Sequence, residues 1–307
     1  MDLGKITRDM LSVIDAHGFE QKGAYNLRYN GSALCHGDSE NIKIVKKQDK
    51  PGIDIIIGSK TDGESVHIPV VLSESGLNDL VYNDFYVEDG ANVEIIAGCG
   101  IHNDGACDSR HDGIHSFHIG KNARVTYEEK HYGEGSGKGK RFLNPQTVIE
   151  VGEDSVFTMD TAQIKGVDST NRKTTVILKK GARLIVTERL MTHLDQKAQS
   201  DITVELKGTG SSAQIISRSV AKGESVQLFH PIAVGESKCQ AHIQCDSIIM
   251  DNAQVSSIPQ IDAKNVDAAI IHEAAIGRIN NEQLTKLMTL GIAEDKAEAI
   301  IIENFLN

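Results

Sequence analysis

The segment GANVEIIAG, residues 90–98, contains the pattern that decides the fold. A glycine and a small or polar residue form a corner, and a short strand rich in β-branched residues follows. The arrangement returns in GKNARVTYEEK (120–130), GEDSVFTMDTAQI (152–164), GARLIVTERL (181–190) and GSSAQIISRSV (210–220). These corners lie about thirty residues apart, a period typical of repeat architectures in which each unit buries its face against the next.

The recurring corner favours a coiled β-solenoid over a β-sandwich, because the turns of a sandwich return about every 8–12 residues. Aromatic residues make up 4% of the chain and Trp is absent, so the core must be built from Val, Ile, Leu and Ala. Short alternating segments such as NIKIVKK (41–47) and IDIIIGS (53–59) predict further strands nearer the N-terminus. We therefore predict an all-β core.

Helical patterns stand at the two ends of the chain. Apolar residues at helical spacing predict an amphipathic helix over 4–18, with Gly18 as its stop. NEQLTKLMTLG (281–291) and AEDKAEAIIIENFL (293–306) predict two short helices separated at Gly291. The expected organisation is an N-terminal segment of helix and short strands (1–64), a β-solenoid (65–279) and a helical segment (280–307).

Composition argues against several classes of function. The formal net charge of −11 disfavours a nucleic-acid-binding protein, which needs a basic face, and a protein that binds anionic membranes. We see no secretory signal and no apolar run long enough to span a membrane. Five cysteines in a chain of 307 residues do not resemble a disulfide framework, so we expect reduced thiols and a cytoplasmic location.

The first cluster that could carry chemistry contains Cys239, His242, Cys245, His272 and Glu273. Thiolate and imidazole are ligands suited to iron, zinc and iron–sulfur clusters. Steps of three residues along a strand alternate between its two faces, so the first three side chains need not converge. The alternative is a small buried hydrophobe at Cys245 and a hydrogen-bonded surface residue at His272, and the spacing alone favours this alternative.

The second cluster is the segment 99–131, which is rich in histidine and cysteine. Such enrichment is a compositional indication of metal or sulfur handling. Alternation along strands could instead place some of these side chains on an outward face, so both interpretations stay open. The residues concerned are Cys99, His102, Cys107, His111, His115, His118 and His131.

Other features argue against an active site on this chain. The loop GEGSGKGK (133–140) fails the phosphate-binding pattern, because its spacing is wrong and Gly139 stands where Ser or Thr would hold Mg²⁺. We therefore expect no ATP site here. No nucleophile elbow, catalytic triad or carboxylate pair stands out, and we predict that the protein is not an enzyme. Four charged residues in strand-like contexts are assigned to solvated faces: Arg172, Glu188, Arg189 and Arg218.

Several of these segments resemble the SufB/SufD family of iron–sulfur cluster assembly scaffolds in the SUF system. The resemblance runs from about residue 65 onward. It rests above all on CQAHIQCDSIIMDNAQVSSIPQIDAKNVDAAIIHEAAIGRI (239–279) and the helical tail. Shorter segments support it: EKHYGEGSGKGKR (129–141), QIKGVDSTNR (163–172), GARLIVTERL (181–190), SDITVEL (200–206) and SRSVAKGESVQLF (217–229).

The resemblance implies a right-handed parallel β-helix whose C-terminal helices dock on the ABC-type ATPase SufC. In SufB-like members the cysteine of the CDS motif, here Cys245, and the HEA residues, here His272 and Glu273, lie at the subunit interface where the cluster forms. SufD-like members keep the histidine but lack that cysteine. Since this chain has both, the resemblance implies a SufB-like homodimer of the kind expected in a minimal SUF system.

The chain is shorter than typical SufB proteins, chiefly on its N-terminal side. The cysteine that accepts sulfur inside the longer proteins has no clear counterpart here. Cys99 and Cys107 are candidates by neighbourhood, and Cys239 and His242 are an additional thiol and imidazole near the interface.

The function expected from the resemblance is a non-catalytic scaffold that assembles a transient cluster, expected to be [4Fe-4S]. Its expected partners are the ATPase, a second copy and a cysteine desulfurase system as sulfur donor. The alternatives are an accessory subunit of an ABC-ATPase system without cluster chemistry, and a purely structural β-solenoid. A carbohydrate-active solenoid would need an acidic cleft with positioned carboxylates.

Overall fold

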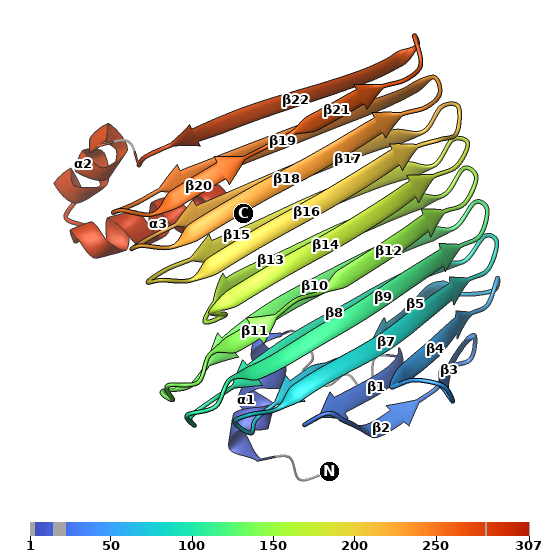
Figure 1. The fold of residues 1–307 in the computed structure, drawn as a ribbon, viewed down its shortest axis with the longest axis horizontal. Helices are drawn as coiled ribbons and strands as arrows, with labels where there is room; N and C mark the ends of the chain where they lie inside the picture. The colour runs from blue at the N-terminus through green and yellow to red at the C-terminus, as the bar shows by residue number, and fades with distance from the viewer. Residues whose placement is uncertain (1–3, 15–22, 280, 307) are drawn as a thin grey trace.

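The computed structural model describes residues 4–14, 23–279 and 281–306. About 59% of the residues form strands, and parallel pairing coils them into a β-solenoid of about eight turns (Figure 1). This confirms the predicted all-β core with helices at both ends. The division of the chain at residues 64 and 279 stays a prediction.

Two eleven-stranded sheets form the walls of the solenoid, and the chain passes from one sheet to the other in every turn. The first wall, sheet A, has antiparallel pairing between β1 and β2 and parallel pairing beyond them. Its strands are β1 (Gly23–Tyr29), β2 (Ser32–Gly37), β5 (Asp62–His67), β6 (Val70–Leu72), β8 (Asn92–His102), β10 (Arg124–Glu134), β13 (Val156–Lys165), β15 (Arg183–Thr192), β17 (Ser212–Ala221), β19 (Cys239–Ile249) and β22 (Ala268–Gly277).

Sheet B is the opposite wall. Here β3 and β4 form an antiparallel pair and the remaining strands are parallel. Its strands are β3 (Ile42–Lys46), β4 (Gly52–Ile57), β7 (Asn78–Val87), β9 (Ser109–Ile119), β11 (Arg141–Leu143), β12 (Gln146–Val151), β14 (Ser169–Leu178), β16 (Lys197–Leu206), β18 (Val226–Gly235), β20 (Gln254–Ser257) and β21 (Gln260–Ala263).

The corners found in the sequence stack on one another along one side of the solenoid. Each contains one residue with positive φ, and its backbone N–H donates to the carbonyl of the next corner. Glycine, asparagine and aspartate are the residues that tolerate this left-handed conformation best. The positions are Gly90, Asn122, Asp154, Gly181 and Gly210.

Gly120 and Gly152 therefore do not adopt the left-handed conformation. In their corners the left-handed residue is two positions later, at Asn122 and Asp154. Gly120 and Gly152 are glycines because the stacked corners approach closely. A Cβ on Gly152 would lie 2.0 Å from the carbonyl oxygen of Gly120, and a Cβ on Gly120 would lie 2.7 Å from the backbone nitrogen of Asp89. The thirty-residue period is thus a stack of corners, in which glycine serves two different needs.

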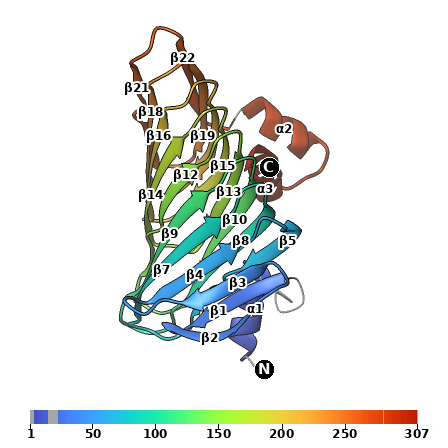
Figure 2. The same cartoon turned by 90° about the vertical axis from the view of Figure 1, so that its right-hand side faces the viewer.

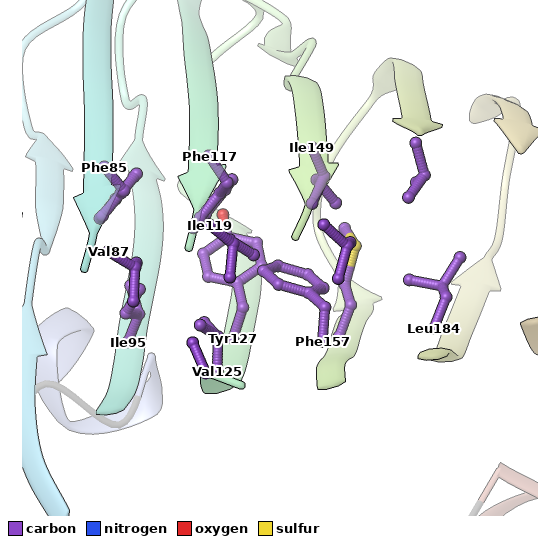
Figure 3. Packing of buried hydrophobic residues seen from close by; sticks show 14 of the residues in the cluster. Phe85, Val87, Ile95, Phe117, Ile119, Val125, Tyr127, Ile149, Phe157 and Leu184 are labelled. Atoms are coloured by element: carbon purple, nitrogen blue, oxygen red, sulfur yellow. The ribbon is translucent and has the colours of Figure 1, made fainter. Parts of the chain in front are cut away.

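The main hydrophobic core fills one side of the space between the two sheets and runs along nearly the whole solenoid. Phe85 and Phe117 stack with ring centroids 4.4 Å apart, and Phe157 meets Phe117 edge-on at 5.2 Å. Figure 3 shows these rings between layers of Val, Ile and Leu from successive turns. Strands such as β7 and β16 alternate between inward and outward side chains, as the period of two requires.

Helix α1 (Lys5–Val13) packs on the outer face of sheet A. Met10 and Ile14 contact Gly98 and Gly100 of β8, where a Cβ would come within 3 Å of their side chains. Ile6 and Val13, two further apolar residues of this helix, are exposed. The predicted stop at Gly18 lies outside the described residues.

Helices α2 (Asn281–Thr289) and α3 (Glu294–Leu306) confirm the predicted helical tail and its break at Gly291, which has a φ of +85°. They lie beside the last turns of the solenoid, on one side of the sheets (Figure 2). Leu306 packs with Val220 and Met250 of the solenoid. Within the described ranges, no helix has the length and apolarity needed to cross a membrane.

Candidate functional site

Cys245 and His272 meet inside the last turn of the solenoid. Both point inward from sheet A, Cys245 from β19 and His272 from the neighbouring strand β22. The Cys245 Sγ lies 3.3 Å from the His272 Nε2 and 3.1 Å from the Ser257 Oγ. The structure therefore brings together the thiol and imidazole that the sequence singled out.

Burial sets the protonation of this pair. It raises the pKa of the Cys245 thiol, which keeps the proton on sulfur at neutral pH, and it lowers the pKa of the His272 imidazole. A neutral imidazole offers a nitrogen lone pair, and a metal ion displaces the proton of a thiol when it binds. The pair can thus supply two soft-to-borderline ligands to one metal centre.

The pair lies at an open end of the solenoid. Among the described residues, no further strand pairs with the outer edges of β20, β21 and β22. Ile261 stands in register with the buried Ala233, yet its side chain is 44% exposed. His272 is half-buried for the same reason. The interior of the last turn is therefore accessible to whatever covers this end.

Glu273 and His242 face the opposite side of the sheet from Cys245 and His272. Their side chains point outward, and the His242 Nε2 lies 3.4 Å from the Glu273 Oε2. Successive residues of a strand point to opposite faces, so His272 and Glu273 separate although they are adjacent in sequence. The ligand role of Glu273 stays a prediction, and in this arrangement Glu273 does not lie beside the sulfur of Cys245.

Cys239 is buried at the start of β19, six residues before Cys245 and on the same inward face. That spacing corresponds to about 20 Å along a strand. Its Sγ lies close to Gly235 and belongs to the hydrophobic core. Cys239 is thus structurally separate from the pair.

The segment 99–131 divides between the two faces of its strands. Its inward members are Cys99, His111, His115 and His131, and Cys99 and His131 are partners across β8 and β10. Its remaining members, His102, Cys107 and His118, lie on outward faces or in an exposed turn. Within residues 4–14, 23–279 and 281–306, no group of three or more His, Cys, Asp and Glu side chains is arranged to hold a metal ion.

A column of buried polar side chains leads from the middle of the solenoid to Cys245. In sheet A these residues occupy equivalent positions of successive strands, so each lies directly above the last. Ser217, the neighbour of Cys245, donates to the Glu188 Oε2 at 3.0 Å, and Ser200 of sheet B donates to the Glu188 Oε1 at 2.7 Å. The row is Glu129, Thr161, Glu188, Ser217 and Cys245.

Arg172 anchors this column, and its place corrects the sequence interpretation. Its guanidinium donates to Glu129 and lies 3.7 Å from the Glu188 carboxylate, and the three residues are 2–8% exposed. The neighbouring guanidinium and His131 hold the pKa of Glu129 well below its usual range against the effect of burial. Arg172 and Glu188 are thus a buried ion pair, whereas Arg189 pairs with Asp160 on the outer face.

Strand parity could have located this column from the sequence. Polar residues at the inward positions of several successive strands, such as Glu129, Thr161, Glu188 and Ser217, are unusual unless they pair with one another. Two cavities of about 10 Å³, each about the size of one water molecule, interrupt the packing beside Glu188.

Comparison with known proteins identifies the family. The sequence model described as SUF system FeS cluster assembly, SufBD core domain, matches residues 80–305. A curated iron-sulfur cluster assembly SufBD family protein of Methanocaldococcus jannaschii is 26% identical over 295 residues, which cover 89% of this chain and 92% of that protein.

Two further relatives carry the same family name. The protein of Methanothermobacter thermautotrophicus (strain Winter) is 25% identical over 77% of this chain and 57% of its own length. A protein of Pyrococcus horikoshii is 31% identical over 66% of this chain and 61% of its own length. The chain thus spans little more than half of some longer relatives. With the core domain matched over most of its length, this chain belongs to the SufBD family of the SUF system.

Proposed function

We propose that this protein is a scaffold on which iron and sulfide are assembled into a nascent iron–sulfur cluster. The observation that carries the proposal is the contact between Cys245 and His272 inside an open end of the solenoid. In this proposal the cluster is cargo, because a site with few thiolates and a half-exposed imidazole holds it less firmly than four thiolates would.

Two ligands do not complete a site, and a second copy of the chain would supply the others. Iron–sulfur clusters are commonly held by four protein ligands, which are cysteine thiolates or histidines. An isologous contact between two open ends would bring two Cys245–His272 pairs toward one axis. The half-exposed apolar side chains at this end, among them Ile258, Ile261 and Ile271, would be covered by the same contact.

The C-terminal helices would dock an ABC-type ATPase. A groove of about 510 Å³ lies between α2, α3 and the end of β19 and is mainly apolar. Exposed Leu290 and Met288 extend this apolar surface at the end of α2. ATP binding by the partner would then shift the population of open-end arrangements, because α3 packs directly on β17 and on Met250, five residues beyond Cys245 in the chain.

The test is anaerobic reconstitution with Fe²⁺, cysteine desulfurase and L-cysteine, followed by the absorbance of thiolate-to-iron charge transfer. Cys245→Ala and His272→Ala should each lose most of the wild-type absorbance. Cys239→Ala is the matched control, because it removes a buried thiol from the same face of the same strand. Glu273→Ala reports whether the outward carboxylate takes part.

The alternatives make different predictions. An accessory subunit without cluster chemistry, or a purely structural solenoid, would show no difference between Cys245→Ala and Cys239→Ala. A cluster retained in both Cys245→Ala and His272→Ala would contradict the proposed site. Binding of the ATPase to a chain that forms no cluster would favour the accessory role.

A further inference from the structure

Ser257 contacts the Cys245 sulfur from the opposite wall of the solenoid. It is the last residue of β20 in sheet B, whereas Cys245 belongs to β19 in sheet A. The Ser257 Oγ lies 3.1 Å from the Cys245 Sγ, so this contact crosses the interior. The function proposed above gives Ser257 no part.

This contact is the last of a series between the two walls. Ser257 belongs to an inward row of sheet B that faces the polar column of sheet A, and the members of this row in successive strands are Arg172, Ser200, Phe229 and Ser257. The Arg172 guanidinium lies 3.7 Å from the Glu188 carboxylate, and Ser200 donates to that carboxylate at 2.7 Å. In the last turn, the side chain that receives the contact from sheet B is Cys245.

The packing around Cys245 leaves room for its side chain to move. A cavity of about 10 Å³, about the size of one water molecule, borders both Cys245 and Ser257. The position of the sulfur depends on one torsion angle, which has three staggered minima. The contacts with the Ser257 Oγ and with the His272 Nε2, at 3.1 and 3.3 Å, select one of these minima. A typical hydrogen bond favours one minimum by roughly fivefold.

The Ser257 hydroxyl becomes the donor of this hydrogen bond when Cys245 binds a metal. In the free thiol either atom can donate. A metal displaces the thiol proton, and the thiolate sulfur that remains can only accept. Hydrogen bonds to ligating sulfurs tune a metal centre, and such partners also orient the ligand. Ser257 therefore lies where it can both aim the sulfur and stabilise its negative charge.

From these contacts we propose that Ser257 is a positioning residue for Cys245. It holds the sulfur in one rotamer from the opposite wall, and it donates a hydrogen bond to the thiolate once a metal has bound. The first half of this proposal is independent of any metal. The second half rests on the function proposed above.

A metal-free measurement on the full chain tests the first half. Thr and Val have the same shape, but only Thr keeps the hydroxyl, so Ser257→Thr and Ser257→Val form a matched pair. With ¹³C-labelled cysteine, the Hα–Hβ couplings of Cys245 should report one rotamer in the wild type and in Ser257→Thr, and averaged rotamers in Ser257→Val. Cys245→Ala identifies the signal among the five cysteines, and unchanged signals of the other four show that the fold is intact. A single rotamer retained in Ser257→Val would overturn the positioning role.

Anaerobic titration with Co²⁺ tests the second half, because Co²⁺ accepts thiolate and imidazole ligands and gives a sulfur-to-metal charge-transfer band. Cys245→Ala should abolish this band. Ser257→Val should bind Co²⁺ about three- to tenfold more weakly than Ser257→Thr and should shift the band to lower energy, since the thiolate loses a donor. Ser256→Ala is the control, because it removes the exposed neighbouring hydroxyl of the same strand and should have no effect.

The outcomes separate this inference from the proposed function. Equal Co²⁺ affinity and equal band energy in Ser257→Thr and Ser257→Val would overturn the hydrogen bond to the thiolate while leaving the metal site in place. A wild type without a band that depends on Cys245 would contradict the proposed function and the second half together. The rotamer measurement would then still decide whether Ser257 positions Cys245.

Discussion

Inward-facing apolar side chains are buried at the N-terminal end of the solenoid and partly exposed at its C-terminal end. At the N-terminal end, the antiparallel pairs β1–β2 and β3–β4 adjoin the first turn, and Ile55 of β4 is fully buried. At the C-terminal end the inward-facing Ile261 is 44% exposed, because no further turn lies beyond β21 among the described residues. An inward-facing side chain is therefore buried only when a further turn of the solenoid covers it. The uncovered end is also where Cys245 and His272 meet.

The largest expected effect compares core positions at the two ends. Ile55→Ala should lower the free energy of unfolding by about 2–5 kcal/mol, because it leaves a cavity in a sealed layer. Ile270→Ala at the open end should cost roughly half as much or less, since Ile270 is only partly buried. Urea unfolding of dilute protein measures both. Equal losses would show that the C-terminal end is covered in solution.

The pH dependence of stability should reveal the sealed interior. Burial lowers the pKa of His115 to about 4, below the value of 6.5 of an exposed histidine. The unfolded chain then binds a proton between pH 6.5 and 4 that the folded chain does not, so stability falls as the pH falls through this window. The expected loss is about 3 kcal/mol.

His115→Gln should remove most of this pH dependence from urea unfolding measured at several pH values. His272→Gln is the counterpart at the open end and should change the slope less, because its imidazole is half-buried and its pKa is lowered by burial alone. A wild-type slope unaffected by His115→Gln would mean that water reaches this imidazole.

Self-association should depend on the open end alone. Ile261→Lys places a charge in the surface that a second copy would cover and should weaken the dimer by about 10- to 100-fold. Ile56→Lys, at a comparably exposed site near the other end, is the control and should leave the dimer unchanged. Sedimentation velocity over a range of concentrations measures the difference. A monomeric wild type would remove the second copy from the proposed site.

The smallest expected effect concerns the attachment of the helical tail. Lys222 and Glu298 form an ion pair of 3.1 Å between the solenoid and α3, and both side chains are partly exposed. Lys222→Ala should lower the free energy of unfolding by no more than about 1 kcal/mol, and this loss should become smaller at high salt. Hydrogen exchange in α3 checks this, and a much larger effect would mean that this ion pair, in place of the Leu306 contacts, holds the tail.

Much of the architecture could be predicted because its causes are local. The corner at Gly90 and the strand after it carry their own conformational preferences, and their repetition implies stacking. The alternation of inward and outward residues along β14 and β15 also puts Arg172 and Glu188 on the inward face, although their charges suggested solvated faces. A charged side chain can be buried only if an oppositely charged partner from another strand lies beside it, and the sequence alone does not show which residues become neighbours.

The sequence by itself determined the repeat, the helical tail, the family resemblance and the selection of Cys245 and His272 as candidate site residues. Each of these depends on residue types at fixed spacings along the chain. Only the tertiary structure decided that these two side chains meet while Glu273 turns away. The physical reason is that contacts across parallel strands join residues about thirty positions apart, and their geometry follows from register and face, which no single segment specifies.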